Sequence, residues 1–376
     1  MSFSVMLFVL VLFVAYANGA NDNFKGVATL FGANVIDYKA AITLATVATL
    51  AGALVSAWFA GALVQAFSGK GLAPDAIVES NQFKLAVAAG AGFTVLLATK
   101  LGFPVSTTHG LTGALLGAGF MAAGENLNLH QLGHSFVLPL LVSPVFAALT
   151  VIPLYPAARW LTRKLGVGRQ TCVCVGPGRF APIAAQPCGS ALDIAGSTLK
   201  IKIALGEAPA CIEKYDGLVF GFIAQKLVDR LHFVSAAAVS FARGLNDTPK
   251  IVALAFGATA LNLNVSIATI ALAMAIGGLL NAHRVAETMS RKISVMRDGQ
   301  ALTANLVTAL YVVFASHLGL PVSTTHVAVG AISGIGAANG GVNRGTVGAI
   351  VLAWILTLPV AAVAGALAYV AVAALK

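Results

Sequence analysis

The sequence predicts an all-α membrane protein with many spanning helices. Hydrophobic residues make up 58% of the 376 residues, charged residues only 10%, and the mean hydropathy is +0.89. Soluble domains carry about a quarter charged residues, so most of this surface must face lipid. Long apolar runs favour helices over the alternating strands of a membrane barrel. The net charge of +10 is concentrated in a few loops, so we expect the lipid bilayer as a partner and no nucleic acid.

Two polar sequence blocks each occur twice in the same order, which predicts a duplicated unit. A glycine, an apolar residue and Asn-Asp stand at Gly19–Asp22 and again at Gly244–Asp247. The residues Pro-Val-Ser-Thr-Thr-His are identical at Pro104–His109 and Pro321–His326. A repeated packing pattern would explain small apolar residues, but it would not explain these polar ones. The predicted organisation is transmembrane repeat 1, a central loop and transmembrane repeat 2, over residues 1–160, 161–215 and 216–376.

Each repeat contains the same elements in the same order. They are an apolar stretch interrupted by Asn-Asp, a long uninterrupted helix, a re-entrant helical hairpin and a closing span. In repeat 1 we expect them over residues 3–36, 40–65, 81–122 and 135–159. In repeat 2 we expect them over residues 229–261, 265–289, 300–338 and 346–374. The proline and hydroxyl residues of the second block favour a hairpin tip over a straight span.

A re-entrant hairpin enters and leaves on one side, so each repeat crosses the membrane an odd number of times. The second repeat is then inverted relative to the first. With the central loop in the cytoplasm, the predicted cytoplasmic basic residues are Lys39, Arg159, Arg163, Lys164, Arg169, Arg179, Lys200, Lys202, Lys214, Arg291, Lys292, Arg297 and Arg344. The opposite side keeps little more than Lys70, Lys84 and Lys376, which satisfies the positive-inside rule. We expect a multi-pass protein of the cell (inner or plasma) membrane with both termini extracytoplasmic.

Asp22 and Asp247 are the first candidates for chemistry. An ionisable residue inside an apolar stretch is costly unless it is paired, so its default interpretation is functional. The alternative is a structural carboxylate that caps a broken helix. Asn21 and Asn246 add neutral oxygens beside the carboxylates, which suits a hard cation such as sodium. We therefore expect these two Asn-Asp pairs to hold coupling cations, with Na⁺ as the candidate metal.

The hairpin tips carry candidate anion ligands, which are Ser106, Thr107, Thr108, Ser323, Thr324 and Thr325. At the start of a helix, these hydroxyls stand beside free backbone N–H groups, which favour an anion. Capping of the helix is the simpler alternative. Two inverted hairpins would bring both sets together at the middle of the membrane.

His109 and His326 end the tips, where they cap or orient the hairpin; proton handling is the alternative. A Ser-His-Asp hydrolase lacks support, because no nucleophile elbow is present and the array occurs twice. We expect no catalytic residues and no enzyme activity.

A tetrahedral oxyanion suits hydroxyls and helix N-termini that approach from two sides. The nearby carboxylates would repel a dianion, so we expect cations to bind with it, which is a reason for symport. Phosphate carries an O–H that can donate to a carboxylate, whereas sulfate has none. Phosphate is therefore favoured, with a sulfate permease of the same fold as the alternative and a channel as the competing class. No cofactor is expected besides the coupling ion, Na⁺ or H⁺.

These two doubled blocks resemble the signatures of the inorganic phosphate transporter (PiT) family, and the resemblance covers nearly the whole chain except the central loop. It implies symport of phosphate driven by sodium or protons, with phosphate held by the hairpin Ser and Thr residues and cations by the Asn-Asp pairs. The family usually has a glutamate in the long helix of each half. This chain keeps Glu287 in repeat 2, which we add to the cation-coupling set, and has Ala62 at the equivalent position of repeat 1.

Arg243, before the second Asn-Asp block, is an accessory candidate. We expect it to pair with Asp247 or Glu287, and direct contact with the anion is the alternative. All four cysteines, Cys172, Cys174, Cys188 and Cys211, lie in the central loop, and their spacing matches no zinc pattern. We expect free thiols there. Transporters of this size are often oligomeric, and a homodimer is the state we suggest.

Overall fold

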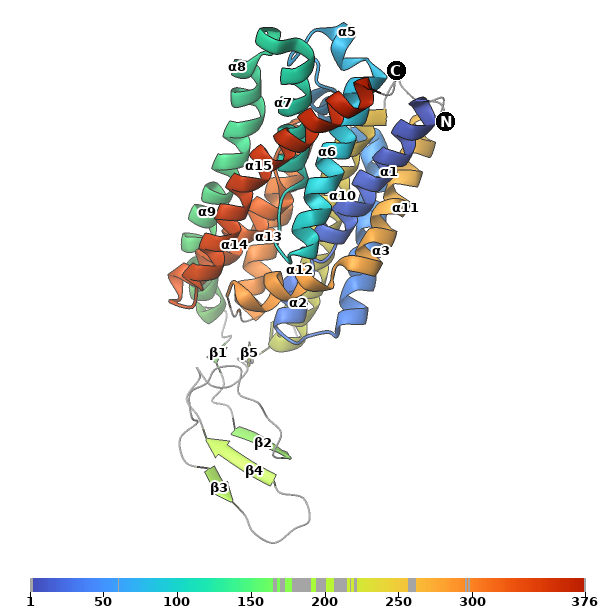
Figure 1. The fold of residues 1–376 in the computed structure, drawn as a ribbon. Coiled ribbons are helices and arrows are strands. Elements are labelled where there is room, and N and C mark those ends of the chain that lie inside the picture. The colour runs from blue at the N-terminus through green and yellow to red at the C-terminus, as the bar shows by residue number, and fades with distance from the viewer. Residues whose placement is uncertain are drawn as a thin grey trace.

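Long apolar helices lie side by side in the computed structural model (Figure 1). The structure describes residues 3–374 except 60, 165–167, 170–172, 178–190, 194–200, 206–214, 217, 220–221, 256–261, 295 and 297. Within these residues, seven helices are long and apolar enough to cross a membrane, by length and composition. They cover Phe3–Asp22, Tyr38–Trp58, Asn81–Lys100, Leu129–Leu161, Leu263–Asn281, Gly299–His317 and Arg344–Ala373. The prediction of a helical protein with many spans is confirmed.

Repeat 1 follows the predicted order of elements. Its helices are α1 (Phe3–Asp22), α2 (Ala28–Gly32), α3 (Tyr38–Phe59), α4 (Gly61–Phe67), α5 (Asp75–Val78), α6 (Asn81–Lys100), α7 (Thr107–Ala123), α8 (Leu129–Leu132) and α9 (Leu138–Lys164). A 3₁₀ turn (Gly124–Asn126) and a π turn (Gly133–Val137) link the last of these. Between α1 and α2 the backbone tightens, because Lys25 N donates to Asp22 O at 3.1 Å and Val27 N to Phe24 O at 3.2 Å. Helix α1 therefore ends at Asp22, and a series of turns leads to α2.

Repeat 2 differs from the prediction in two places. Its helices are α10 (Ala224–Ala255), α11 (Leu263–Asn281), α12 (His283–Glu287), α13 (Asp298–His317), α14 (Thr324–Ala338) and α15 (Arg344–Ala373), with a π turn at Thr288–Lys292. The predicted interruption at Asn246-Asp247 is wrong, because α10 continues through both residues and through Pro249. Packing against α3 and α13 supports it there, which offsets the hydrogen bond that the proline cannot make. The predicted helix over 265–289 is also wrong, because α11 ends at Asn281, whose side chain donates to the Tyr16 hydroxyl of α1.

Both hairpins form where the sequence predicts them. In repeat 1 the chain turns between α6 and α7, and in repeat 2 it turns between α13 and α14. Gly102 and Gly319 stand two residues before the proline of each tip, with φ of 77° and 68°. A side chain is strained in this left-handed region, so the glycines permit both turns. The two tips therefore have the same local backbone.

Short strands lie in the central segment. They are β1 (Gly168–Arg169), β2 (Val173–Pro177), β3 (Ala191–Asp193), β4 (Ile201–Leu205), β5 (Tyr215–Asp216), β6 (Leu218–Val219) and β7 (Phe222–Ile223), in sheets β1-β5, β2-β4-β3 and β6-β7, all antiparallel. The sequence does not predict these strands. The side chains of the four cysteines lie outside the described part of the chain, so the free-thiol prediction stays a prediction.

The helices of each repeat pack against those of the other. α1 packs on α11, and α10 packs on α3. A Cβ atom on Gly19 would lie 1.8 Å from the backbone oxygen of Met274, and one on Gly244 would lie 2.1 Å from that of Thr49. The glycine of each Asn-Asp block is therefore a point of close approach between the two repeats.

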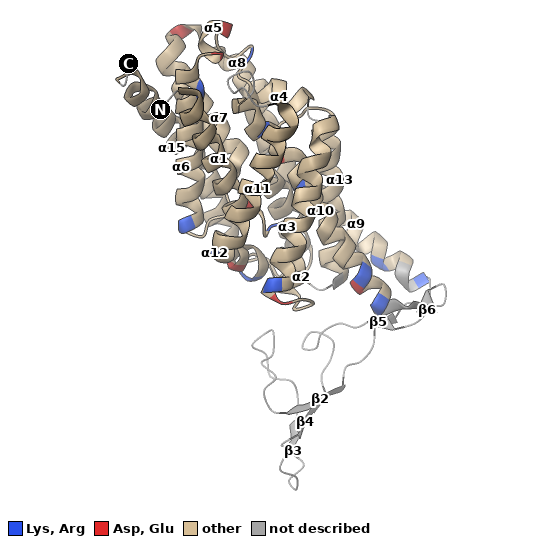
Figure 2. Cartoon of the chain, turned by 90° about the vertical axis from the view of Figure 1, so that its right-hand side faces the viewer, with Lys and Arg blue, Asp and Glu red and all other residues tan. Residues whose placement is uncertain are grey.

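The ends of the bundle carry most of its charge. α1 begins and α15 ends at one end of the bundle, and α9 ends and α10 begins at the opposite end (Figure 1). Figure 2 shows Lys and Arg gathered mostly at the end opposite the termini, with a nearly uncharged surface between the ends. This distribution is typical of a protein that crosses a bilayer.

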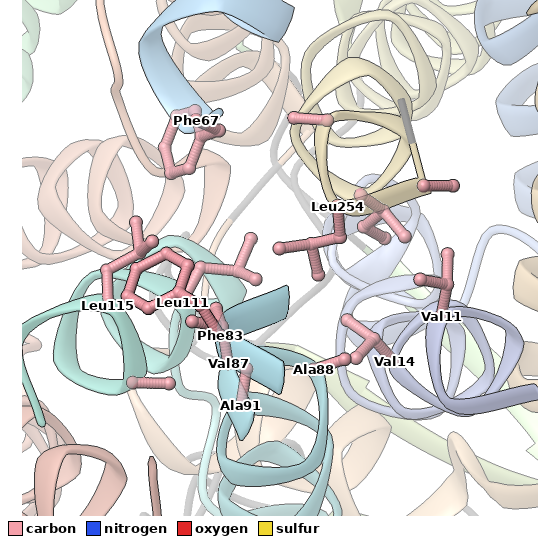
Figure 3. Packing of buried hydrophobic residues seen from close by; sticks show 14 of the residues in the cluster. Val11, Val14, Phe67, Phe83, Val87, Ala88, Ala91, Leu111, Leu115 and Leu254 are labelled. Atoms are coloured by element: carbon pink, nitrogen blue, oxygen red, sulfur yellow. The ribbon is translucent and has the colours of Figure 1, made fainter. Parts of the chain in front are cut away.

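A hydrophobic cluster fills the space beside the hairpin of repeat 1 (Figure 3). It joins α1, α4, α6, α7 and α10, and its labelled members are Val11, Val14, Phe67, Phe83, Val87, Ala88, Ala91, Leu111, Leu115 and Leu254. These side chains are excluded from solvent, so the cluster holds α7 and its hydroxyl-bearing start in place.

Candidate functional site

The tips of the two hairpins meet in the interior of the bundle. The Thr108 hydroxyl donates to the Val322 carbonyl at 3.4 Å, and the Thr325 hydroxyl donates to the Val105 carbonyl at 3.0 Å. The rings of His109 and His326 lie with their centroids 4.5 Å apart. The two contacts are equivalent, because each joins the last threonine of one tip to the valine carbonyl of the other tip. The predicted convergence of the hydroxyl-bearing turns is thus confirmed.

All six predicted anion ligands are buried, and the two serines among them cap helices. Each is at most 3% exposed. Ser106 accepts the backbone N–H of His109, and Ser323 accepts that of His326, both at 3.3 Å. These two serines are therefore helix caps, as the simpler alternative proposed. The Thr108 and Thr325 hydroxyls contact the other repeat, whereas those of Thr107 and Thr324 contact the Asn-Asp block of their own repeat.

Asp22 and Asp247 lie on either side of a shared amide. Asn18 Nδ2 is 3.2 Å from Asp22 Oδ2 and 3.1 Å from Asp247 Oδ2. The same nitrogen is 3.0 Å from the Thr107 hydroxyl, which itself donates to Asp22 Oδ2 at 3.3 Å. The two carboxylates, one from each repeat, thus belong to one hydrogen-bonded group. Asn18 is a member of the site that the sequence reasoning missed.

Lys25 is the second residue that the sequence reasoning missed, and it is fully buried. Its Nζ donates to Asp22 Oδ1 at 2.5 Å and to the Asn21 side-chain oxygen at 2.9 Å. It also reaches the Val105 carbonyl at 2.7 Å and the Thr325 hydroxyl at 2.5 Å. One ammonium group therefore connects an Asn-Asp pair to the tips of both hairpins.

Lys250 makes the equivalent contacts from repeat 2. Its Nζ lies 3.4 Å from Asp247 Oδ1 and donates to the Val322 carbonyl at 2.7 Å and to the Thr108 hydroxyl at 2.9 Å. Each lysine thus contacts the tip carbonyl of its own repeat and the threonine of the other. The signal for both was present in the sequence, because a lysine follows each Asn-Asp aspartate by three residues. That spacing places the two side chains on one face of a helical turn.

Arg243 is the third buried cation of the site. Its Nε lies 3.7 Å from Asp247 Oδ2, which is the ion pair that the sequence predicts. Its other nitrogens donate to the Asn18 side-chain oxygen at 2.6 Å, to Asn23 at 2.9 Å and to Thr49 at 3.1 Å. Arg243 is therefore held by the helices of repeat 1 and is fixed in direction.

The asparagines of both blocks attach the hairpins to the helices beside them. Asn21 Nδ2 donates to the Thr99 hydroxyl at 2.9 Å and to the Phe103 carbonyl at 3.0 Å. Asn246 Nδ2 lies 3.3 Å from the Val322 carbonyl, and its oxygen accepts from Ser316 at 3.1 Å. Their amides thus hold the tips in position.

The formal charge of this site differs from the expectation. Asp22 and Asp247 face three basic side chains, Lys25, Lys250 and Arg243, so the buried group carries one positive charge in excess. From the sequence we expect only Arg243 as an internal partner, for Asp247 or Glu287, and external cations at both Asn-Asp pairs. In the structure the chain itself supplies those cations.

Glu287 is not brought to this site. It is exposed at the end of α12, whereas Asn21, Asp22, Asn246 and Asp247 are all buried. Its counterpart Ala62 lies against Gly319, where an added Cβ atom on the glycine would lie 2.6 Å from Ala62 Cβ. The structure thus separates the glutamate from the other predicted cation residues.

The histidines pack in the interior between the tips. His326 Nδ1 lies 2.9 Å from the Leu140 carbonyl, and its ring stacks on Trp354 at 3.9 Å between centroids. The Trp354 indole donates to the Pro104 carbonyl at 3.0 Å. Among the described atoms, His109 Nδ1 and His326 Nε2 have no hydrogen-bond partner. His326 therefore joins the tip of repeat 2 to α9 and α15. In the described ranges there is no cluster of three or more His, Cys, Asp or Glu residues that could hold a metal ion.

Comparison with known proteins assigns the chain to a family. The model of the phosphate transporter family (PHO4) matches residues 18–365. A protein of Pyrococcus abyssi named "Putative phosphate permease" is 30% identical over 97% of this chain and 96% of its own. The chloroplastic inorganic phosphate transporter 2-1 of Arabidopsis thaliana is 27% identical over 96% of this chain and 70% of its own.

The fold agrees with this assignment. A solved structure titled "The sodium-dependent phosphate transporter" matches with a TM-score of 0.77 at 22% identity and covers 100% of both chains. The family match extends over both Asn-Asp blocks and both hairpins, which are the parts that build the buried site. The chain therefore belongs to the phosphate transporter family.

Proposed function

We propose that this protein is a secondary active transporter that imports inorganic phosphate by symport with a cation, Na⁺ or H⁺, through alternating access. Its phosphate lies between the two hairpin tips, where Thr107, Thr108, Thr324 and Thr325 offer hydroxyls. The single observation that carries the proposal is that Thr325 and Thr108 each contact a buried lysine of the other repeat. Hydroxyl donors and ammonium groups together suit a tetrahedral oxyanion.

Burial of the site supports alternating access. The threonines of both tips are at most 3% exposed, so an anion enters or leaves only after helices separate on one side. The opposite directions of α1 and α10 in Figure 1, and the exchange of contacts between the tips, support two inverted repeats. In this arrangement the central segment is cytoplasmic and the termini are extracytoplasmic, as the positive-inside rule favours.

Phosphate is favoured over sulfate by the carboxylates beside the hydroxyls. Thr107 donates to Asp22 Oδ2 at 3.3 Å, so an anion at the threonines lies within reach of a carboxylate. A protonated phosphate oxygen can donate to that acceptor, whereas sulfate has no proton to offer. No step of the cycle makes or breaks a covalent bond, so the protein acts as a transporter and not as an enzyme.

Uptake into proteoliposomes tests this proposal. Purified protein is reconstituted, and labelled phosphate uptake is followed under an imposed sodium or proton gradient, with and without an equal concentration of sulfate. We expect phosphate to accumulate inside above its external concentration. We also expect sulfate not to inhibit this uptake. Phosphate accumulation that never exceeds the level set by its own electrochemical gradient indicates a channel. Strong inhibition by sulfate indicates the sulfate permease.

A further inference from the structure

The ammonium group of Lys25 occupies the position that the sequence assigns to a coupling cation. Four oxygen atoms lie within 2.9 Å of its Nζ, from a carboxylate, an amide, a backbone carbonyl and a hydroxyl. This mixture of oxygen ligands is typical of a site for a hard cation such as sodium. An ammonium group has only three N–H donors, so the surrounding oxygens exceed what one lysine requires.

Lys250 fills the equivalent position in repeat 2. A carboxylate, a backbone carbonyl and a hydroxyl surround its Nζ at 3.4, 2.7 and 2.9 Å. The side chains of both lysines are at most 1% exposed. Both Asn-Asp pairs are therefore already provided with a positive charge from the chain.

We propose that Lys25 and Lys250 are tethered cations that replace sodium at the Asn21-Asp22 and Asn246-Asp247 sites, so that phosphate transport by this chain does not depend on sodium. The inference rests on the proposed function, because it names the charges that accompany phosphate in that same site. It excludes sodium from the two coupling ions left open above.

Electrostatics prevents a sodium ion from sharing these sites. An ion bound by the oxygens of Asn21, Asp22 and Thr325 would lie beside the Lys25 ammonium, and two like charges in a buried place repel strongly. Sodium therefore binds only if the lysine leaves, which would break every contact that it makes with the tips.

The tethered charges lie between the carboxylates and the anion-binding hydroxyls. Lys25 contacts both Asp22 and Thr325, and Lys250 contacts both Asp247 and Thr108. Each ammonium thus offsets a carboxylate and also faces the place where phosphate is proposed to bind. A fixed lysine fulfils both tasks of a bound cation without leaving with the phosphate.

The two repeats differ in one further charge. Arg243 stands four residues before Asp247, and Asn18 stands four residues before Asp22. The arginine donates to that asparagine at 2.6 Å. This single basic residue gives the site its excess positive charge, which would offset the charge of a phosphate monoanion. No sodium ion is then needed for a neutral, closed site.

Initial rates of phosphate uptake give the first test. Reconstituted wild-type protein is assayed in sodium chloride and in choline chloride, at the same pH and with the same imposed proton gradient. We expect equal rates in the two salts. A rate that falls severalfold in choline overturns the tethered-cation proposal while the phosphate proposal stands. Absence of uptake under every gradient contradicts the proposed function instead, and the second test then decides the inference.

Thermal unfolding gives that second test without any transport. An ion that binds only the folded state raises the unfolding temperature by mass action. We expect sodium chloride and choline chloride to give the wild type the same unfolding temperature. Lys25→Ala and Lys250→Ala, prepared separately, vacate one cation site each, and we expect sodium to stabilise both variants.

Lys39→Ala is the matched control, because it removes an exposed lysine at the start of α3. It should respond to the two salts as the wild type does. Selective stabilisation of the wild type by sodium overturns the inference, and so does a folded alanine variant that remains indifferent to sodium. The wild-type measurement decides the question even where an alanine variant does not fold.

Discussion

The Asp22–Lys25 turn of repeat 1 and the Asp247–Lys250 turn of repeat 2 place the same pair of charges on different backbones. α1 ends at Asp22 and the chain tightens before α2, whereas α10 continues through Asp247, Pro249 and Lys250 as one helix. Even so, both ammonium groups contact the tip carbonyl of their own hairpin and the threonine of the other. The same contacts with the tips are therefore made from two different local backbones.

The two turns also differ in how their charges are shared. The Lys25–Asp22 pair is short, at 2.5 Å, whereas Asp247 is shared between Lys250 at 3.4 Å and Arg243 at 3.7 Å. Among the described ion pairs, Asp22 thus has one basic partner, and Asp247 has two. This asymmetry is open to direct test.

Loss of one carboxylate has the largest expected effect. Asp22→Asn strands the buried Lys25 ammonium, which should lower the free energy of unfolding by about 3–5 kcal/mol. Adding Lys25→Met removes the stranded charge and should recover most of the loss. In repeat 2, adding Lys250→Met to Asp247→Asn should recover less, because Arg243 still faces the lost carboxylate. Unfolding in mixed micelles measures all four variants, and equal recovery in both repeats would contradict the asymmetry.

Removal of the threonine hydroxyls that contact the lysines comes next. Thr325→Val and Thr108→Val each delete one acceptor of an ammonium group and should cost about 1.5–3 kcal/mol of unfolding free energy. Both should also lower phosphate uptake. Thr112→Val is the matched control, because this buried threonine of α7 has a hydroxyl without a described partner. An equal loss of unfolding free energy in Thr112→Val would contradict the role of the tip hydroxyls as partners of the lysines.

Added volume at Gly19 and Gly244, where helices of the two repeats cross, should lower the free energy of unfolding by a similar or slightly smaller amount. Gly19→Ala and Gly244→Ala each bring a methyl group against the backbone of a helix of the other repeat. We expect a loss of about 1–3 kcal/mol from overpacking. Gly348→Ala in α15 meets nothing within 4 Å and should be neutral or stabilising. Thermal unfolding of the three variants checks this, and tolerance of alanine at both crossings would argue against the close approach.

The smallest effect is expected at Glu287. Its side chain is exposed, so Glu287→Gln should change the free energy of unfolding by less than about 0.5 kcal/mol. Phosphate uptake and its response to cations should stay at the wild-type level. A marked loss of cation coupling in this variant would restore the role that the family resemblance implies.

Much of the fold was predictable from the sequence, because its signals are long and repeated. The apolar runs predict the spans, and the doubled Pro-Val-Ser-Thr-Thr-His block predicts two hairpins that meet. The Asn-Asp block predicts an interruption in both repeats, yet α10 is continuous there and a helix ends at the block only in repeat 1. Local propensity did not decide these cases, because packing against other helices overrides it.

The candidate site was predicted in part. The aspartates and threonines were identified, since polar residues inside apolar stretches are rare. Lys25 and Lys250 were missed because the Asn-Asp pairs were interpreted as ligands for external cations, which left no role for a lysine three residues later. Asn18 and Arg243 act across the two repeats, and no local pattern reveals such a contact. The exposure of Glu287 follows from the end of α11 at Asn281, which the sequence does not signal.

The central claim is that both repeats build one shared phosphate site. Equilibrium binding of labelled phosphate to the purified protein tests it most directly, with Thr108→Val and Thr325→Val measured beside the wild type. We expect one phosphate per chain. We also expect Thr108→Val and Thr325→Val to lower the phosphate affinity to a comparable extent. Two phosphates per chain, with each variant losing only one of them, would contradict it.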